Sequence, residues 1–392
     1  MISVTQAKSA ILEHIKLLPT VTLPLMEAIG HVLATDVFAA VDIPAFKQSS
    51  MDGYAIKFED YDRPLELKGE MAAGSTESFL LSSGEAARIF TGAPLPEGAD
   101  TVVMQEKVLV QFGKIVIDDP ALRLSLNTRE KGAEVKSGAL AIAKGTFLTP
   151  AALGFLAGIG ETVVEVYEVP TLSIILTGTE LQSPGKPLGP GQVYESNSFS
   201  LRAALKQSGV KQVSVFTAED DLLTLKAELA AALEVSDIVL LTGGVSVGDY
   251  DFVVEATKLC GVEQVFHKVK QKPGKPLYFG VLGDKLVFGL PGNPSSVLSC
   301  FYQYVLPAIE TLSGRVAQDR LLPAALKQGY EKNAGLTHFV KGHYEKGTVE
   351  ALGAQESFRM SSFASANCMI CLEEERGSYE DGETVNVYML PG

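Results

Sequence analysis

The sequence reads Leu240-Leu-Thr-Gly-Gly-Val-Ser-Val-Gly-Asp249, then His267-Lys-Val-Lys-Gln-Lys-Pro-Gly-Lys-Pro276, then Gly289-Leu-Pro-Gly-Asn-Pro294. Each of these three stretches contains a glycine-rich or proline-glycine turn after a short apolar run. The runs have the length of buried strands, and the first and last turns lead into segments with a helical pattern. Free backbone N–H groups should therefore converge where strands end, which is how a sheet protein holds a phosphate group.

Strands and helices alternate around these turns, between residues 170 and 314. The apolar pattern predicts strands at 172–176, 212–216, 238–241, 262–269, 277–281 and 286–288. It predicts helices at 197–207, 221–233, 252–259 and 293–312. This alternation is typical of an α/β domain with a mostly parallel sheet, which binds ligands beyond the carboxyl ends of its strands.

The chain of 392 residues is acidic, with a formal net charge of −14. That balance argues against binding of nucleic acids or anionic membranes, which need a broad basic surface. Lys268, Lys270, Lys272 and Lys275 are a local exception, which favours a pocket for a small anion; lysines that protect a strand edge are the alternative. On one strand, Lys268 and Lys272 would point to the same face, so a dianion could lie between them.

Localisation can also be predicted from composition. No run approaches the roughly 20 apolar residues of a membrane-spanning helix, and the N-terminus has a helical pattern rather than that of a signal peptide. The four cysteines fit reduced thiols. Cys368 and Cys371 form a C-x-x-C without a second pair at zinc-ribbon spacing, so we expect core residues. The sequence therefore predicts a cytoplasmic protein.

The N-terminal third combines short helices with a β region. Ser3 and Gln6 form a capping-box pattern that opens a helix predicted over residues 3–18, and a second helix is predicted at 25–34. The loop Ile43-Pro-Ala-Phe-Lys-Gln-Ser-Ser-Met-Asp-Gly-Tyr-Ala55 then crowds polar side chains together. An Asp-Gly turn entering a strand explains only part of it. Residues 44–136 should form an all-β domain, followed by a helix at 149–157.

The tail from residue 322 alternates polar and apolar residues and lacks helical periodicity, so it should form a small β-barrel or sandwich. Its Ser361, Ser362, Ser365 and Asn367 could bind a ligand or could simply form a turn.

Six motifs occur together in one order: Ser50-Met-Asp-Gly-Tyr-Ala55, Thr91-Gly-Ala-Pro94, Thr177-Gly-Thr-Glu-Leu181, Thr242-Gly-Gly-Val-Ser-Val-Gly248, Lys272-Pro-Gly-Lys-Pro276 and Gly289-Leu-Pro-Gly-Asn-Pro294. This set resembles the molybdopterin molybdenumtransferase (MoeA) family, which includes the E domain of gephyrin, over essentially the full length. The resemblance implies a multidomain α/β plus β fold. Its parts would be an elongated stalk (1–43 with 137–169), an inserted β domain (44–136), a three-layer α/β domain like that of MogA (170–320) and a C-terminal β-barrel (321–392).

The resemblance also implies the last step of molybdenum cofactor synthesis. An adenylylated molybdopterin is hydrolysed, AMP is released, and molybdate is inserted at the dithiolene with help from a divalent cation such as Mg²⁺. The expected partners are these small molecules, a second copy of the chain in a homodimer and, as a further possibility, the adenylyltransferase that makes the substrate.

Motif matching assigns roles to individual residues. The expected catalytic residues are Asp52, Thr91, Glu180, Asp220 and Asp251, of which Asp220 and Asp251 would hold the cation. Molybdate would be received by Arg129, Lys268, Lys272 and Ser365. The substrate would be bound by Thr177, Gly178, Asn197, Thr242, Gly243, Gly244, Ser246, Gly248, Lys272, Pro273, Gly274, Lys275, Pro291, Gly292, Asn293 and Pro294.

The chain departs from the family pattern at two places. Gly132-Ala133-Glu134 replaces the usual Gly-Glu-Asp, and Tyr194-Glu195 replaces Tyr-Asp, which puts a ligand role for Glu195 in doubt. Two other functions stay open on sequence alone. One is a gephyrin-like scaffold protein, and the other is an adenylyltransferase or nucleotide hydrolase that shares only the α/β domain.

Overall fold

In the computed structural model, the chain is described over residues 1–76, 78–245, 252–316 and 320–391. Its contacts divide it into two compact units. The first comprises residues 1–21, 30–32 and 166–392, and the second comprises residues 22–29 and 33–165. The finer division into four domains stays a prediction. Within the described ranges, no helix is both long enough and apolar enough to cross a membrane.

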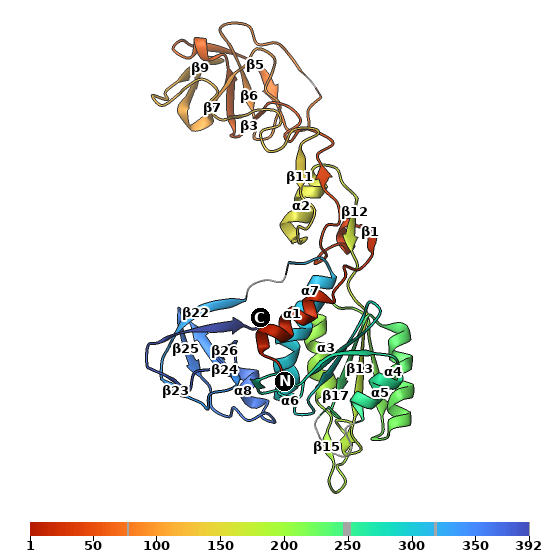
Figure 1. Cartoon of the computed structure of the whole chain (residues 1–392). Coiled ribbons are helices and arrows are strands. Elements are labelled where there is room, and N and C mark those ends of the chain that lie inside the picture. The colour runs from red at the N-terminus through yellow and green to blue at the C-terminus, as the bar shows by residue number, and fades with distance from the viewer. Residues whose placement is uncertain (77, 246–251, 317–319, 392) are drawn as a thin grey trace. The chain divides into compact units, whose positions relative to one another are not determined.

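The first unit is built on a six-stranded sheet in the order β16-β13-β17-β21-β20-β18 (Figure 1). Its first four strands are parallel, and β20 and β18 run antiparallel to their neighbours. The strands are β13 (Leu172–Thr177), β16 (Val213–Ala218), β17 (Ile238–Thr242), β18 (Glu263–His267), β20 (Tyr278–Leu282) and β21 (Lys285–Leu290). Thus the predicted central α/β domain is confirmed, because these strands alternate with helices along the chain.

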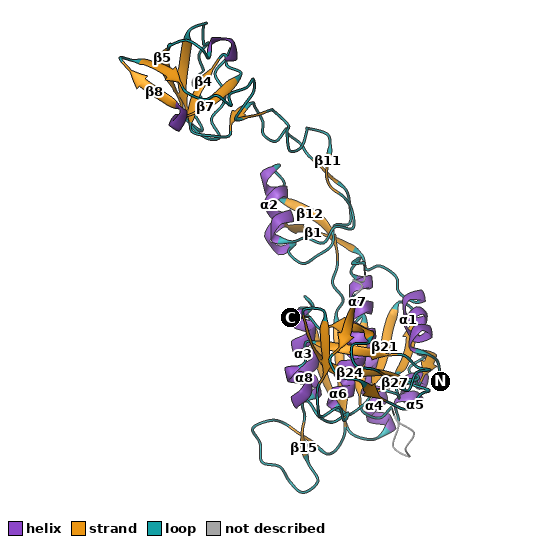
Figure 2. Ribbon diagram, turned by 90° about the vertical axis from the view of Figure 1, so that its left-hand side faces the viewer, coloured by secondary structure: helices purple, strands orange, loops and turns teal. Residues whose placement is uncertain are grey.

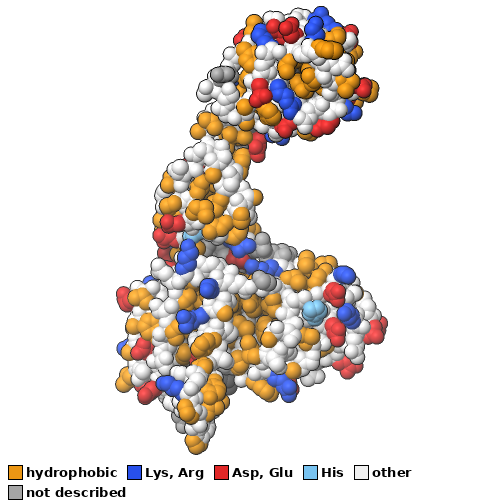
Figure 3. Space-filling model, turned by 180° about the vertical axis from the view of Figure 1, so that it is seen from behind, with side chains coloured by type: hydrophobic (Ala, Val, Ile, Leu, Met, Phe, Trp, Pro, Cys, Tyr) orange, Lys and Arg blue, Asp and Glu red, His pale blue; other side chains and the backbone are white. Residues whose placement is uncertain are grey.

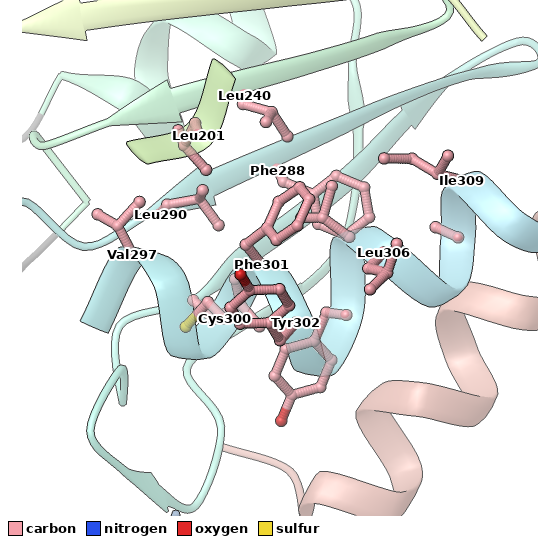
Figure 4. Close-up of a cluster of buried hydrophobic side chains, with 14 of the residues drawn as sticks. Leu201, Leu240, Phe288, Leu290, Val297, Cys300, Phe301, Tyr302, Leu306 and Ile309 are labelled. Atoms are coloured by element: carbon pink, nitrogen blue, oxygen red, sulfur yellow. The ribbon is translucent and has the colours of Figure 1, made fainter. Parts of the chain in front are cut away.

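Helices cover both faces of this sheet, because its central strands are apolar on both sides. Ile174 and Leu240 point to the face covered by α1 (Val4–Glu13), α3 (Asn197–Gln207), α6 (Pro294–Cys300) and α7 (Leu306–Leu312). Ile175 and Leu241 point to the other face, under α4 (Leu222–Val235) and α5 (Val253–Leu259). Figure 4 shows the first layer, where Val297, Phe301 and Leu306 lie against Leu290 and Phe288 of the sheet.

The C-terminal strands close into a five-stranded barrel, as predicted. The barrel order is β24-β25-β22-β28-β26, and a further pairing between β26 and β24 closes it. Figure 1 shows β22, β24, β25 and β26 together, and Figure 2 shows β24 and β27 in orange from another side. The strands are β22 (Leu321–Leu326), β24 (Thr337–Glu345), β25 (Thr348–Ala351), β26 (Cys368–Leu372) and β28 (Thr384–Met389), and β23 (Tyr330–Glu331) pairs with β27 (Ser378–Tyr379) beside them. Helix α8 (Ser361–Ser365) lies between β25 and β26 in the chain.

The second unit contains a six-stranded sheet in the order β7-β4-β6-β5-β9-β8. The strands are β4 (Gly53–Ile56), β5 (Leu65–Met71), β6 (Glu85–Ile89), β7 (Thr101–Met104), β8 (Val108–Gln111) and β9 (Lys114–Ile117). Shorter pairs join β2 (Val37–Phe38) to β11 (Leu140–Ile142) and β3 (Gln48–Ser49) to β10 (Thr128–Arg129). Helix α2 (Pro150–Gly158) has Thr149 as its N-cap, and β1 (Thr20–Pro24) pairs with β12 (Val163–Tyr167).

Two predictions for the N-terminal helices are wrong in part or whole. α1 has the predicted capping box of Ser3 and Gln6 but ends at Glu13. Leu18 instead donates its backbone N–H to Leu312, at 2.9 Å, and Pro19 disfavours helical geometry at the residue before it. The predicted helix at 25–34 is only the 3-10 turn η1 (Leu25–Glu27), because Gly30 takes a φ of 80°.

The predicted helix at 293–312 is interrupted by a π-helical turn, η4 (Phe301–Val305). Pro307 has no backbone N–H to donate to residue 303, so the regular α-helical ladder cannot continue through this point.

A second difference concerns the strand predicted at 262–269. It ends at His267, and Lys268 takes a φ of 74°. Lys268 and Lys272 therefore do not share a strand, and the expected one-sided pair is wrong.

Acidic and basic side chains are interspersed on the face seen in Figure 3, where neither sign forms one broad surface. This distribution agrees with a chain in which 33 Lys and Arg residues stand against 47 Asp and Glu residues.

Candidate functional site

A cavity of about 700 Å³ opens in the first unit beyond the carboxyl ends of β13, β17 and β21. These three strands are neighbours, with Leu176 opposite Thr242 and Thr242 opposite Leu290. The turn that follows each strand therefore reaches the same edge of the sheet, as an open parallel sheet requires. The cavity is lined by these predicted site residues: Thr177, Gly178, Glu180, Asn197, Asp220, Thr242, Gly243, Gly244, Pro291, Gly292, Asn293 and Pro294.

Two glycines let the turns approach one another closely. Gly243 has a φ of 88°, and a Cβ atom there would lie 2.8 Å from the hydroxyl oxygen of Thr177. Gly178 has a φ of 137°, and a Cβ atom there would lie 2.6 Å from Oε2 of Glu180. Larger residues would separate the loops and displace the Glu180 carboxylate. The glycines thus keep polar groups and backbone close together around the cavity.

Asn197 lines the cavity and carries an acceptor atom without a partner among the described residues. Its Nδ2 donates to the carbonyl of Gly292 at 2.9 Å, which fixes the side chain between the start of α3 and the turn after β21. Its Oδ1 is buried and has no hydrogen-bond partner among the described residues. Because a buried polar atom without a partner costs free energy, Oδ1 is suited to accept a hydrogen bond from a ligand.

The acids around the cavity differ in how they are engaged. Asp220 accepts the backbone N–H of Thr179 at 3.1 Å. Its neighbour Asp221 is the N-cap of α4, and the hydrogen bonds from Thr224 and Leu223 lower the pKa of Asp221. Glu195 is buried, and its two carboxylate oxygens accept from the N–H and the hydroxyl of Ser198 at 2.7 and 2.6 Å. Glu195 thus orders the first turn of α3 rather than presenting free oxygens.

The lysine segment lies apart from this cavity, since Pro276 lines it but Lys268, Lys272, Pro273, Gly274 and Lys275 do not. Gly274 is buried against α6, where a Cβ atom would collide with the Cys300 sulfur. This close packing gives Gly274 a structural reason that sequence analysis did not provide. Lys270 forms an ion pair with Glu374 at 2.6 Å.

Lys272 lies on β19 (Gln271–Lys272), which pairs with β24 of the barrel, opposite His338. Burial, together with the positive charges of Lys332 and Lys272, lowers the pKa of His338 to about 4. Three basic side chains therefore meet around one point of the barrel edge. Sequence analysis missed His338, which only the pairing of β19 with β24 brings opposite Lys272, and Lys332, whose charge acts on the same imidazole. Ser365 is exposed on α8 and does not line the cavity.

The remaining predicted residues belong to the second unit. Thr91 donates its backbone N–H and its hydroxyl to Oδ1 of Asp52, both at 2.8 Å. These hydrogen bonds, together with the charge of Arg88, hold the pKa of Asp52 below its usual value. Arg129 lies on β10 opposite Gln48 of β3, in the same segment as Asp52. Arg88, which donates to the carbonyl of Gly53 at 2.9 Å, is a neighbour that the motifs did not reveal.

Gly53 has a packing role within that loop, because a Cβ atom there would collide with the carbonyl of Val103 on β7. The Gly132-Ala133-Glu134 departure lies beside the same loop: Gly132 and Glu134 donate backbone hydrogen bonds to the carbonyls of Pro44 and Ile43.

The expected cation site is only partly described. Asp220 lines the cavity, whereas Ser246, Gly248 and Asp251 lie outside the described residues. In the part of the chain that the structure describes, no group of three or more His, Cys, Asp or Glu side chains could hold a metal ion. Glu180 and Asp220 nevertheless supply carboxylate oxygen atoms to the cavity, which are the kind of ligand that a hard divalent cation takes.

Three family models match the chain in order. They describe the MoeA N-terminal region (domain I and II) at residues 2–160, a probable molybdopterin binding domain at 173–311 and the MoeA C-terminal region (domain IV) at 323–390.

Curated relatives match over nearly the whole length. A molybdopterin molybdenumtransferase of Haemophilus influenzae is 35% identical over 398 residues, covering 99% of this chain and 98% of the relative. One from Staphylococcus aureus is 32% identical, covering 99% and 95%. The crystal structure of a molybdopterin biosynthesis moeA protein from Pyrococcus horikoshii has a TM-score of 0.85 at 30% identity and covers all of both chains. An enzyme that shares only the α/β domain is therefore the wrong alternative.

Proposed function

Because this chain belongs to the MoeA family of molybdopterin molybdenumtransferases, whose part in molybdenum cofactor biosynthesis is the insertion of molybdenum, we propose that its substrate is an adenylylated molybdopterin. In the proposed reaction water adds to a phosphorus atom of the phosphoanhydride and the bridging P–O bond breaks. AMP leaves, and molybdate enters at the dithiolene. Two Mo–S bonds form, and one molybdate oxygen leaves as water with the two thiol protons.

The cavity beyond β13, β17 and β21 is the observation that carries this proposal. Its volume of about 700 Å³ lies within the usual range for small-molecule sites. Three turns line it, and two of their glycines permit approaches that a side chain would block. An elongated ligand with a phosphate bridge needs such backbone surfaces around its oxygens.

Individual side chains have distinct tasks in the proposed reaction. Asn197 Oδ1, which is buried without a partner, accepts a hydrogen bond from the substrate. Glu180 and Asp220 face the same cavity, where carboxylates can orient water for attack on phosphorus. Asp52 has a lowered pKa and is therefore a weak base. We assign it an orienting and electrostatic task as an ionised carboxylate, with Thr91 as its fixed partner.

A divalent cation, Mg²⁺ in this proposal, would be held by Asp220 and Asp251 together with substrate phosphates. When bound, it would neutralise charge on the phosphates and polarise the bond that breaks. Molybdate is a tetrahedral dianion, and we assign its capture to Lys272, supported by Lys268, Arg129 and Ser365. The charge of Lys332 near Lys272 favours this assignment, because two positive charges lower the free energy of a dianion, and the neutral imidazole of His338 can donate a hydrogen bond.

We further propose that the enzyme acts in the cytoplasm as a homodimer and receives its substrate from the adenylyltransferase that makes it. A direct experiment is to incubate the purified chain with adenylylated molybdopterin, molybdate and Mg²⁺ and to follow AMP by chromatography. AMP release that the Glu180→Ala variant abolishes supports the proposal. Equal release by the variant and wild type would contradict the assigned cavity.

A further inference from the structure

The aromatic ring of Phe358 lines the candidate cavity, although it does not belong to the α/β sheet. It lies in the connection between β25 and α8, and its side chain is 61% exposed. An exposed phenylalanine gives up the free energy that burial would provide, but single exposed apolar residues are common in proteins. Exposure of Phe358 alone therefore does not indicate a ligand contact, and the hydrogen bonds that hold its backbone are needed as a second observation.

Hydrogen bonds fix the backbone on both sides of Phe358. Ser295 donates its N–H to the carbonyl of Ser357 at 3.1 Å, and Asn293 Nδ2 donates to the Ser357 hydroxyl at 2.8 Å. On the other side, Lys341 Nζ donates to the carbonyl of Arg359 at 3.0 Å, and Lys341 is itself only 2% exposed. The backbone at Phe358 is thus held beside the turn of Gly292 to Pro294, so little backbone entropy is left to lose when a ligand binds the ring.

We propose that Phe358 is a stacking platform for the planar heteroaromatic ring of the substrate, which is either the pterin or the adenine. This inference rests on the proposed function, because it names a contact of the proposed substrate. The Arg359 guanidinium lies over the Phe358 ring at 5.6 Å from its centroid, so one face of the ring is occupied and a ligand ring stacks on the other. Stacking recognises the flat ring, whereas the glycine turns recognise the phosphate bridge.

Affinity measurements by calorimetry test this contact. Phe358→Ala should bind the ligand with the stacked ring roughly tenfold more weakly or worse, the loss expected from removal of an aromatic stacking partner. Phe358→Tyr should retain affinity. Phe199→Ala is the matched control, because Phe199 on α3 is 57% exposed and does not line this cavity. AMP and metal-free molybdopterin are titrated separately, which distinguishes the adenine from the pterin.

The chain contains no tryptophan, so Phe358→Trp introduces a single tryptophan at the proposed platform, whose emission can be excited apart from that of the 12 tyrosines. If adenine is the stacked ring, AMP should quench this fluorescence and leave that of Phe199→Trp unchanged. If the pterin is stacked, AMP should not quench, and Phe358→Ala should lose affinity for molybdopterin alone. Either result supports the platform.

The inference is overturned if wild type binds both ligands and Phe358→Ala binds each as tightly. A wild type that binds neither AMP nor molybdopterin would instead overturn the proposed function itself, and the stacking contact with it. The two failures are therefore distinguishable in the same set of titrations.

Discussion

Thr91 places two hydrogen-bond donors on one oxygen of Asp52, its backbone N–H and its hydroxyl, both 2.8 Å from Oδ1. Donors that face a carboxylate stabilise its charged form, so the pKa of Asp52 is lowered. Asp52 is accordingly ionised well into the acidic range and holds one orientation. This relationship explains why two motifs separated by 39 residues in the chain occur together: one supplies the carboxylate of Asp52, and the other supplies the Thr91 donors that bind it.

The first prediction is that Thr91→Val raises the pKa of Asp52. The valine keeps the backbone N–H bond and loses the hydroxyl bond, so the charged form is less stabilised. If the reaction needs the Asp52 carboxylate, the acidic limb of the pH–rate profile should move to higher pH, and activity should fall earlier as the pH is lowered. Thr91→Ser keeps both donors and should retain the wild-type profile. Identical profiles for all three proteins would remove Asp52 from the reaction.

A second prediction separates the close approach at Gly178 from backbone strain alone. Gly178→Ala places a methyl group against the Glu180 carboxylate and should reduce kcat/KM by about 10-fold to 100-fold, the cost of displacing a positioned group. Gly185→Ala is the matched control, because Gly185, which follows the short strand β14 (Leu181–Gln182), has a φ of 89° but open space where its Cβ would lie. Comparable losses in both variants would show that strain, not the position of Glu180, limits activity.

The third prediction concerns molybdate and the pKa of His338. This pKa lies near 4 because of burial and because Lys332 and Lys272 repel a second positive charge. A dianion bound beside Lys272 would offset that repulsion, so molybdate should raise the pKa of His338, as followed by NMR of the imidazole groups. Lys272→Gln should show a smaller rise at the same molybdate concentration. An unchanged His338 titration in saturating molybdate would place the dianion elsewhere.

The fourth prediction is that Asp52 of one subunit completes the cavity of the other. Asp52 and the cavity belong to different compact units of the chain, and a two-fold dimer creates two equivalent shared sites. Asp52→Ala and Glu180→Ala homodimers should both be poorly active. A mixed dimer should then regain one intact site, because both lesions fall in the same cavity. Mixed dimers no more active than the parents would show that each Asp52 serves its own chain.

Local patterns in the sequence predicted much of the fold, because helix caps, hairpins and strand ends are determined by residues that are close together in the chain. The capping box of Ser3 and Gln6 opens α1 as predicted, and the hairpin at Phe112 and Gly113 forms between β8 and β9. The turns after β13, β17 and β21 meet at one cavity, as expected from parallel strands. These features follow from periodicity and turn chemistry alone.

The errors occurred where distant parts of the chain decide the local structure. Lys268 follows the end of β18 with a φ of 74°, and Lys272 lies on the separate strand β19, so the lysine pair has no common face. Lys272 pairs with the barrel rather than with the α/β sheet, which no local pattern indicated. Phe358 reaches the cavity from a segment more than sixty residues after the last predicted turn, and only tertiary hydrogen bonds place it there.

The central claim is that this chain couples cleavage of an adenylylated molybdopterin to insertion of molybdenum. The most direct measurement is the ratio of AMP released to molybdenum bound to the pterin, in single turnovers at increasing molybdate. The account predicts one AMP for each molybdenum inserted, with both products lost together in Glu180→Ala. The account would be contradicted if molybdenum entered free molybdopterin as fast as it enters the adenylylated substrate, and if no AMP were formed from that substrate.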